Sequence, residues 1–236
     1  MREIEWLPKL GMTAILSGAS GSGKSVFLCK LLMQWPEIFP DVPIRRILII
    51  YHTKQKIHER IREFFGDEKC VLSQYLLPIH LEDEFLGPKT EGAAILWLDD
   101  ATVDGYCDSK LVNSIACAKC HHNYLCCFIL VQSLTCSSTN VWRTIRRNAN
   151  QLFLFSLNRE LHILRVLNSQ MFGGASGREN LILSAYQMAK ADFEKYLGSK
   201  FSYLWINSDV NTAFNQQLRT GLLKGEPRIL YEVSGL

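Results

Sequence analysis

The sequence lacks the features that mark membrane-spanning, secreted or disordered chains. No apolar run reaches the roughly 20 residues that a helix needs to cross a bilayer, and residues 1–5, which include two acids, do not resemble a signal peptide. Internal repeats and low-complexity tracts are also missing. The 236 residues are 47% hydrophobic and 21% charged, which are globular values. We therefore expect one folded domain over residues 1–236, intracellular and without a membrane partner.

Neither sign of charge dominates, because 26 Lys and Arg residues against 23 Asp and Glu residues give a net charge of +3. A weakly basic chain can bind DNA where a local surface gathers its cations, but this net charge does not by itself indicate nucleic-acid binding. The basic residues outside the motifs described below are interpreted as solvated faces, with DNA contact as the alternative. They are Lys54, Lys56, Arg60 and Arg62 on an expected helix, and Arg178, Arg219, Lys224 and Arg228 late in the chain.

The eight cysteines do not form the pattern of a disulfide framework, because they are unevenly spaced in a chain without a secretion signal. Cys117 and Cys120, followed by His121 and His122, resemble half of a zinc site. No second well-spaced Cys/His pair follows them. Buried thiols that pack as small apolar groups are the favoured interpretation, and a zinc site is the alternative.

What the sequence does contain, near its start, is a full Walker A loop, G-x-x-x-x-G-K-S, over residues 18–25. The loop follows an apolar run and precedes an amphipathic stretch, so it has the strand–loop–helix context that the motif requires. Glycines allow backbone N–H groups to surround phosphate oxygens, and the helix N-terminus adds positive charge. We expect Lys24 to reach the β- and γ-phosphates of ATP and the Ser25 hydroxyl to bind Mg²⁺. The expected nucleotide-binding residues are Gly18, Ala19, Ser20, Gly21, Ser22, Gly23, Lys24, Ser25 and Val26.

A second motif, the apolar run 93–98 followed by Asp99 and Asp100, has the form of a Walker B strand. Two acids at the end of an apolar strand are costly to bury without a cation, which favours a metal site. We expect Asp99 to hold Mg²⁺ through water, and Asp100 to orient and deprotonate the attacking water. A strand end with solvated acids is the alternative.

A third apolar run, 126–131, ends in Gln132. An amide at this position can contact the γ-phosphate or the attacking water, and hydrolysis needs that positioning; an ordinary polar strand end is the alternative. Arg143, Arg146 and Arg147 follow within five residues. They either form a solvated helix face or include an arginine finger that acts on a neighbouring subunit, and the finger is the favoured interpretation.

Several nucleotide-binding classes are disfavoured by motifs that the sequence lacks. It has no N-K-x-D motif, which disfavours a GTPase, and no L-S-G-G-Q signature, which disfavours an ABC-type ATPase. A small-molecule kinase would need an acceptor pocket and lid arginines, whereas two aspartates with a glutamine favour water as the acceptor.

Together these motifs resemble the FtsK/HerA superfamily, and within it the genome-packaging ATPases of the poxvirus type, including those of virophages, Polinton/Maverick elements and adintoviruses. The resemblance covers residues 12–155 and rests on the H-x-N, V-Q-S, I-R-x-N and L-F patterns that surround and follow the Walker B motif. It implies the roles given above for both Walker motifs and a sensor role for Gln132. It places a trans-acting arginine among Arg143, Arg146 and Arg147, with Arg146 as the best match to I-R-x-N.

Two features depart from the family pattern. Lys119-Cys120-His121 stands where many relatives have an arginine before the histidine, and the chain is short, without an evident accessory DNA-binding domain.

The resemblance implies an ATP-driven subunit of a homo-oligomeric ring that moves double-stranded DNA of any sequence into a capsid at a vertex or portal protein. It would act in the host nucleus or in a cytoplasmic virus factory, or be associated with the virion. A HerA-like translocase or helicase in replication or repair is one alternative. A nucleotide-gated assembly protein is another, although a pure binder needs no catalytic base such as Asp100. The sequence does not determine ring size, direction of movement or the DNA-contacting loops.

Apolar strands that alternate with helices predict an α/β, three-layer P-loop fold of the RecA/ASCE type, with a mainly parallel sheet. We expect a core over about residues 12–160, then C-terminal helices and edge strands over about 160–236. Asp108 is the expected N-cap of the third helix, and the last two strands are expected to form a hairpin-like edge. Residues 173–177 are expected to form a connecting loop, with a pore loop or subunit-contact loop as the alternative. The expected strands are 12–17, 46–51, 93–99, 125–132, 151–155, 203–206 and 228–233, and the expected helices are 24–34, 54–65, 109–119, 159–168 and 179–197.

Overall fold

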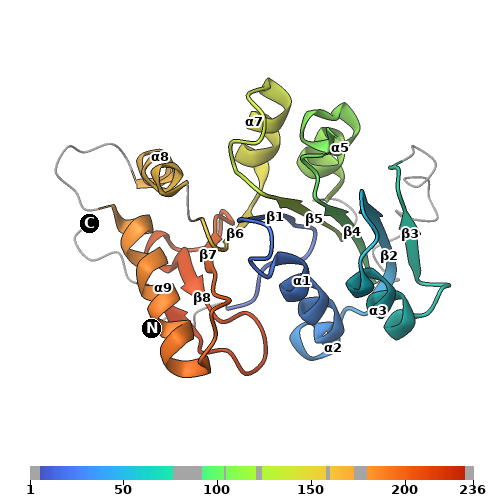
Figure 1. Cartoon of the computed structure of the whole chain (residues 1–236), viewed down its shortest axis with the longest axis horizontal. Coiled ribbons are helices and arrows are strands. Elements are labelled where there is room, and N and C mark those ends of the chain that lie inside the picture. Colours follow the sequence, from blue (N-terminus) through green and yellow to red (C-terminus); the bar gives the residue numbers. More distant parts are fainter. Residues whose placement is uncertain are drawn as a thin grey trace.

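The computed structural model describes residues 6–76, 92–103, 105–120, 124–157, 160–172 and 180–231. These residues form a nine-stranded sheet in the order β3-β2-β4-β5-β1-β6-β7-β8-β9, with helices on both faces (Figure 1). The strands from β3 to β6 in that order are parallel, and the last three are antiparallel additions. The expected mainly parallel α/β fold is therefore confirmed. The strands are β1 (Thr13–Ser17), β2 (Ile44–Tyr51), β3 (Cys70–Ser73), β4 (Ala93–Asp99), β5 (Leu125–Val131), β6 (Gln151–Leu154), β7 (Leu204–Asn207), β8 (Leu218–Thr220) and β9 (Ile229–Leu230).

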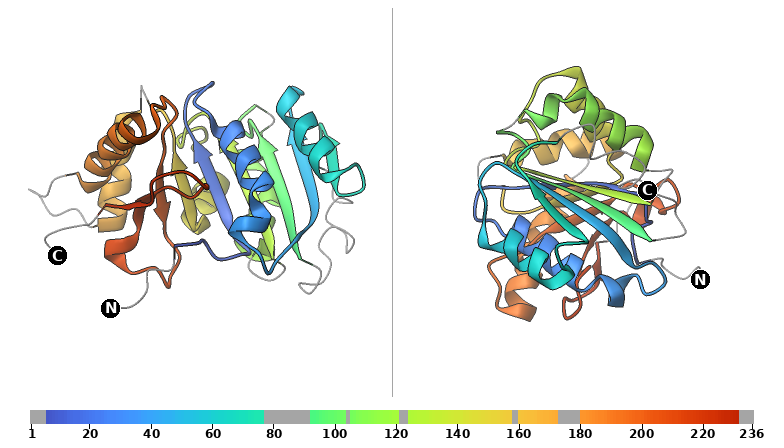
Figure 2. Two further views of the ribbon diagram at one scale, coloured as in Figure 1. Left: turned by 90° about the horizontal axis from the view of Figure 1, so that it is seen from below. Right: turned by 90° about the vertical axis from the view of Figure 1, so that its right-hand side faces the viewer.

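Alternate residues of the central strands face two separate hydrophobic cores. Ile15 lies in one core, and its neighbours Ala14 and Leu16 lie in the other, because successive side chains of a strand point to opposite faces. The view along the sheet in Figure 2 shows the two helical layers with the sheet between them. The first core is covered by α5 (Lys110–Ser114), α7 (Asn140–Asn148) and α8 (Leu161–Phe172), the second by α1 (Lys24–Met33), α2 (Trp35–Ile38) and α3 (Lys56–Phe65), and α9 (Leu181–Leu197) contributes to both.

The strand order brings three chemically important loops to one edge of the sheet. β5 lies between β1 and β4, with Ser17 opposite Val131 and Leu98 opposite Ile129. Because these strands are parallel, their carboxyl ends meet, and the segments that follow them lie side by side. In open α/β sheets, ligands bind at this edge.

Local signals explain where the helices around this edge begin and end. α1 begins after Gly23, which has a left-handed conformation with φ 97°. α3 is preceded by a reciprocal pair of hydrogen bonds between Gln55 and His58 and ends at Gly66, as expected. The side chain of Thr139 accepts a hydrogen bond from the Trp142 amide and so caps α7.

The expected N-cap at Asp108 is wrong by one residue. Ser109 caps α5 by accepting from the Val112 amide, and the helix continues through a π-helical stretch, Ile115–Lys119. Asp108 instead accepts hydrogen bonds of 2.5 Å from the hydroxyls of both Ser137 and Thr139. Its carboxylate therefore ties this segment to the loop that leads into α7.

The C-terminal edge also differs from the expectation. The two expected strands correspond to β7 and β9, but they do not pair with each other, because β8 lies between them. β8 carries Arg219, interpreted above as a solvated cation, yet this side chain is 1% exposed and packs against the rings of Trp6 and Trp205. The expected loop at 173–177, Arg178 and residues 121–123 lie outside the described residues.

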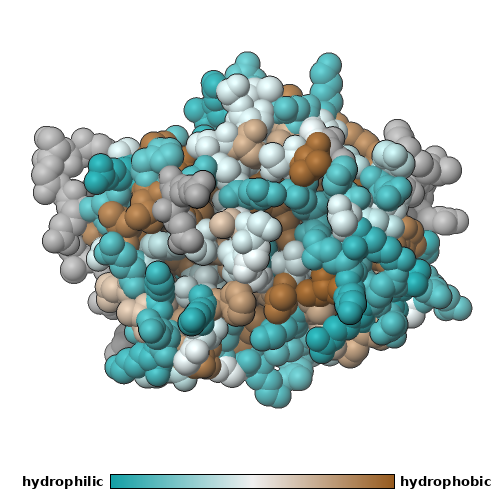
Figure 3. All heavy atoms as spheres, in the orientation of Figure 1, coloured by the Kyte–Doolittle hydropathy of each residue, from teal (hydrophilic) through white to brown (hydrophobic). Residues whose placement is uncertain are grey.

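Exposed apolar side chains form separate patches among hydrophilic ones on the face drawn in Figure 3. Val210, Tyr75 and Phe201 are the most exposed large apolar side chains of the described residues. Within that part of the chain, none of the helices has the length and hydrophobicity that a membrane span requires.

Candidate active site

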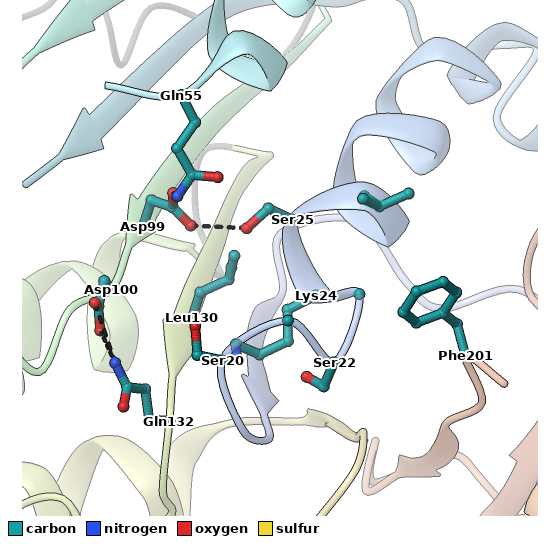
Figure 4. A pocket seen from close by; sticks show the side chains of 13 residues that line it. Ser20, Ser22, Lys24, Ser25, Gln55, Asp99, Asp100, Leu130, Gln132 and Phe201 are labelled. Carbon is teal, nitrogen blue, oxygen red and sulfur yellow. Dashed lines mark hydrogen bonds between the residues drawn. The ribbon is translucent and has the colours of Figure 1, made fainter. Parts of the chain in front are cut away.

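A cleft of about 230 Å³ lies where the carboxyl ends of β1, β4 and β5 meet. It combines the loop after β1 with the two carboxylates that end β4 and the amide that follows β5 (Figure 4). Residues far apart in the sequence thus converge on one cleft. Its lining consists of Ser20, Gly21, Ser22, Gly23, Lys24, Ser25, Val26, Gln55, Asp99, Asp100, Leu130, Gln132 and Phe201.

The loop after β1 is held in place by backbone hydrogen bonds to the neighbouring strand ends. The Gly18 amide donates to the Val131 carbonyl (3.2 Å) and the Ala19 amide to the Ser156 carbonyl (2.9 Å). A Cβ atom at Gly18 would come within 2.8 Å of the Phe155 Cβ, so a side chain does not fit there. The glycine lets the loop follow the sheet edge closely, and the Ser22 amide closes a turn within the loop by donating to the Ala19 carbonyl (3.1 Å).

The side chains of this loop suit an anion. The Lys24 Nζ donates to the carbonyls of Gly18 (2.6 Å) and Ala19 (3.0 Å), which holds the ammonium group against the loop. Burial lowers the pKa of Lys24, and the nearby carboxylates of Asp100 and Asp99 act in the opposite direction. The buried hydroxyl of Ser22 has no hydrogen-bond partner among the described residues, and a phosphate oxygen would provide one.

Ser25 and Asp99, the two residues expected to hold Mg²⁺, lie in contact with each other. The Ser25 hydroxyl donates to Asp99 Oδ1 over 3.1 Å, and Asp99 is 4% exposed. A hydroxyl and a carboxylate are hard oxygen donors of the kind that Mg²⁺ takes beside water and phosphate. The donor set therefore fits a magnesium ion at this position.

Asp99 is also held by side chains that the sequence motifs did not indicate. His58 Nε2 lies 2.8 Å from Asp99 Oδ2, and Gln55 Nε2 donates to the same oxygen over 3.2 Å. The Trp97 indole N–H lies 3.4 Å from Oδ1. The backbone N–H of Gln55 donates to His58 Nδ1, so Nδ1 is the acceptor of the ring and Nε2–H is the donor to the carboxylate.

Gln55 and His58 come from the start of α3, the helix that follows β2, and β2 pairs with β4. Gln55 and His58 stand at the carboxyl end of an apolar strand, and that position is the signal by which they could have been found.

Asp100 and Gln132 form a second pair in the same cleft. The Gln132 amide nitrogen lies 3.3 Å from both oxygens of the Asp100 carboxylate, and Figure 4 shows the two side chains pointing toward each other. Asp100 has a left-handed backbone with φ 53°, which is uncommon for a residue other than glycine. This turn directs the carboxylate away from Asp99, so the two acids face different partners.

The arginines of α7 do not line the cleft. Arg143 is exposed and donates to the Ser138 carbonyl (3.2 Å), and Arg146 donates to the Leu134 carbonyl (3.2 Å). Arg147 is exposed near the end of the helix, and burial together with the two neighbouring cations lowers the pKa of Arg146. The structure therefore brings Lys24, Ser25 and the acidic residues together but leaves these arginines outside their own site.

The structure gives no support to a zinc site in the part of the chain that it describes, where no group of three or more His, Cys, Asp or Glu side chains could hold a metal ion. Cys120 and Cys127 are fully buried in the hydrophobic core. His121 and His122 lie outside the described residues.

Comparisons with known proteins agree with the fold. The genome-packaging NTPase B204 of Sulfolobus turreted icosahedral virus 2, in complex with AMP, matches with a TM-score of 0.51 and 14% identity over 84% of this chain and 92% of that chain. B204, the DNA-packaging ATPase of Sulfolobus turreted icosahedral virus, matches with a TM-score of 0.52 and 14% identity over 84% and 93%. No protein-family model matches the sequence, and the search of curated proteins gives no match. The expected likeness to viral packaging ATPases is confirmed at the level of the fold.

Proposed function

We propose that this chain is an ATPase subunit of a motor that drives double-stranded DNA into a viral capsid. The observation that carries the hydrolytic part is the convergence of Lys24, Asp99 and the Asp100–Gln132 pair in one cleft. The packaging part is supported by a fold shared with B204 over nearly the whole length of that protein.

The loop amides, the Lys24 ammonium group and the Ser22 hydroxyl bind the triphosphate. Ser25 and Asp99 would hold Mg²⁺, which supplies neutralisation of the phosphate charge when it is bound. The hydrogen bonds from Gln55 and His58 hold the Asp99 carboxylate in one orientation in its largely buried position.

Asp100 and Gln132 act on the attacking water. The Asp100 carboxylate accepts a proton from the water, and the Gln132 amide, 3.3 Å away, orients that carboxylate and offers its carbonyl oxygen to the same water. Both groups lie beside the triphosphate loop, so positioning and proton removal occur at the γ-phosphate end.

Charge that develops on the transferring phosphoryl group needs a further cation. The arginines of α7 lie outside their own cleft, so in this proposal one of Arg143, Arg146 and Arg147 acts in the site of a neighbouring subunit. Hydrolysis would then depend on a homo-oligomeric ring, and the loss of the γ-phosphate would move the segments that grip DNA.

DNA is gripped through its phosphate backbone, independently of sequence. Of the basic residues considered for this contact, Lys54 and Arg62 are ion-paired with Glu59, and Lys224 with Glu37. A capsid vertex or portal protein would complete the assembly.

The experiment is ATP hydrolysis by the purified full chain, with and without long double-stranded DNA, beside a Lys24→Ala control and with oligomeric state recorded on the same samples. DNA of unrelated sequences should stimulate turnover equally, and the control should have none. If an assembled ring hydrolysed ATP at the same rate with and without DNA, the proposed motor function would be contradicted. ATP binding with no turnover would point to the nucleotide-gated assembly protein.

A further inference from the structure

A second hollow, of about 430 Å³, adjoins the phosphate cleft on the side away from Asp100 and Gln132. It shares Gly23, Val26 and Phe201 with that cleft, so the two spaces adjoin at the start of α1. In Figure 4, Phe201 lies across the loop from the Asp100–Gln132 pair. A ligand that spans both spaces therefore has one end at the acidic pair and the other at Phe201.

The floor of the hollow is aromatic. The Tyr203 ring centroid lies 4.7 Å from that of Phe27 and 5.6 Å from that of Phe155, and all three side chains are buried. At the mouth, Val26 and Phe201 are 50% and 61% exposed. A large ring that stays exposed beside an aromatic hollow offers a flat face on which a second planar group can stack.

The charges of the hollow do not suit a second phosphate. Glu226 lines it, and the carboxyl accepts hydrogen bonds from the Tyr203 hydroxyl and from the Leu223 amide. Burial raises the pKa of Glu226. Lys30 and Lys224 are the cations of the same lining, and Lys224 is already paired with Glu37. Mixed charge around apolar rings fits an uncharged planar group with polar edges.

We propose that this hollow receives the base of the nucleotide whose phosphates lie on the Walker A loop, and that Phe201 stacks on that base. The inference rests on the proposed nucleotide site and adds the residue that distinguishes a nucleotide from a bare polyphosphate. Stacking contacts the face of the base and makes no hydrogen bonds to its edges, so this contact does not distinguish one purine from another.

The test measures the dissociation constants of ATP and of inorganic tripolyphosphate, both with Mg²⁺, for the full chain and three variants. Phe201→Ala removes the ring, Phe201→Trp keeps a stacking surface, and Phe64→Ala is the matched control, because Phe64 is also about half exposed (51%) but does not line either space. Phe201→Ala should weaken ATP about tenfold and leave tripolyphosphate unchanged. Phe201→Trp should regain most of the ATP affinity that Phe201→Ala loses, and Phe64→Ala should bind both ligands as the parent chain does.

Unchanged ATP affinity in Phe201→Ala would overturn the base site. An equal loss of ATP and tripolyphosphate affinity would also overturn it, because the ring would then support only the phosphate loop. If the parent chain bound neither ligand, the proposed nucleotide site itself would fail, and the base site with it.

Discussion

At the scale of single residues, the Asp99 carboxylate receives more hydrogen bonds than its role in a Walker B motif requires. Ser25, Gln55, His58 and Trp97 all direct donors at it. Such partners orient a metal ligand, and their loss typically costs about 10–100-fold in metal affinity. His58 is 0% exposed and lies closest among the three that the motifs missed, so it is the partner to test.

We predict that His58→Leu, which keeps bulk but removes the donor, raises the Mg²⁺ concentration required for tight ATP binding by about tenfold or more. His58→Gln can still direct an amide N–H at Asp99 and should stay closer to the parent chain. ATP-binding titrations over a series of Mg²⁺ concentrations measure this dependence, and thermal unfolding checks that each variant is folded. Unchanged Mg²⁺ dependence in a folded His58→Leu variant would show that the imidazole serves packing alone.

Asp100 differs from Asp99 in that its partner is the exposed amide of Gln132. We predict that Asp100→Asn lowers ATP turnover by about 10²–10⁴-fold, because the general base is lost, while ATP affinity changes little. Steady-state hydrolysis and equilibrium binding on the same preparation measure both quantities. A variant that retained most of its turnover would remove Asp100 from the catalytic role.

The sequence predicted the side chains of this site wherever a local motif defines them. Lys24 and Ser25 lie within one loop, and Asp99 and Asp100 are adjacent. His58 could not be predicted in the same way, because it lies 41 residues before Asp99 and reaches it only through the pairing of β2 with β4.

At the scale of elements, α7 is anchored by its first turn. Thr139 caps the helix through the Trp142 amide, and its hydroxyl also donates to the Asp108 carboxylate. Trp142 is buried, and its indole N–H donates to the Leu134 carbonyl over 2.8 Å. These contacts fix the position of the helix that carries the three arginines.

We predict that Thr139→Ala lowers the free energy of unfolding by about 1 kcal/mol, because the cap is lost. Thr144→Ala is the matched control in the same helix. Within the described part of the chain, its exposed hydroxyl donates to the Asn140 carbonyl alone, so its removal should change stability by less than about 0.5 kcal/mol. Urea unfolding followed by circular dichroism measures both variants. Equal effects in the two would contradict a specific capping role.

The long buried strands were predictable from their apolar runs, whereas β3 and β8 were not. β8 has three residues, Leu218–Thr220, of which two are polar, and Arg219 packs against the rings of both Trp6 and Trp205. A segment this short shows no recognisable alternation of apolar and polar residues, so tertiary contacts determine its structure.

At the scale of the whole molecule, the proposed ring rests on the position of the α7 arginines, which lie outside their own cleft. We predict that Ala replacement of the true finger, one of Arg143, Arg146 and Arg147, abolishes turnover in a homogeneous ring. Mixing that variant with Asp100→Asn subunits should restore part of the activity. At an interface between the two, the arginine variant supplies an intact Asp100 and its neighbour supplies the intact arginine. Mixed rings that form but stay inactive for all three arginines would contradict a finger in trans.

The central claim is that ATP hydrolysis moves this protein along double-stranded DNA. The most direct measurement is the displacement of a third strand from a triplex placed at the end of a linear duplex, which a translocating ring removes without unwinding the duplex. We predict displacement that requires ATP, does not depend on the sequence of the duplex, and is absent in Lys24→Ala and Asp100→Asn. An assembled ring that hydrolyses ATP on DNA but leaves the triplex intact would contradict the motor.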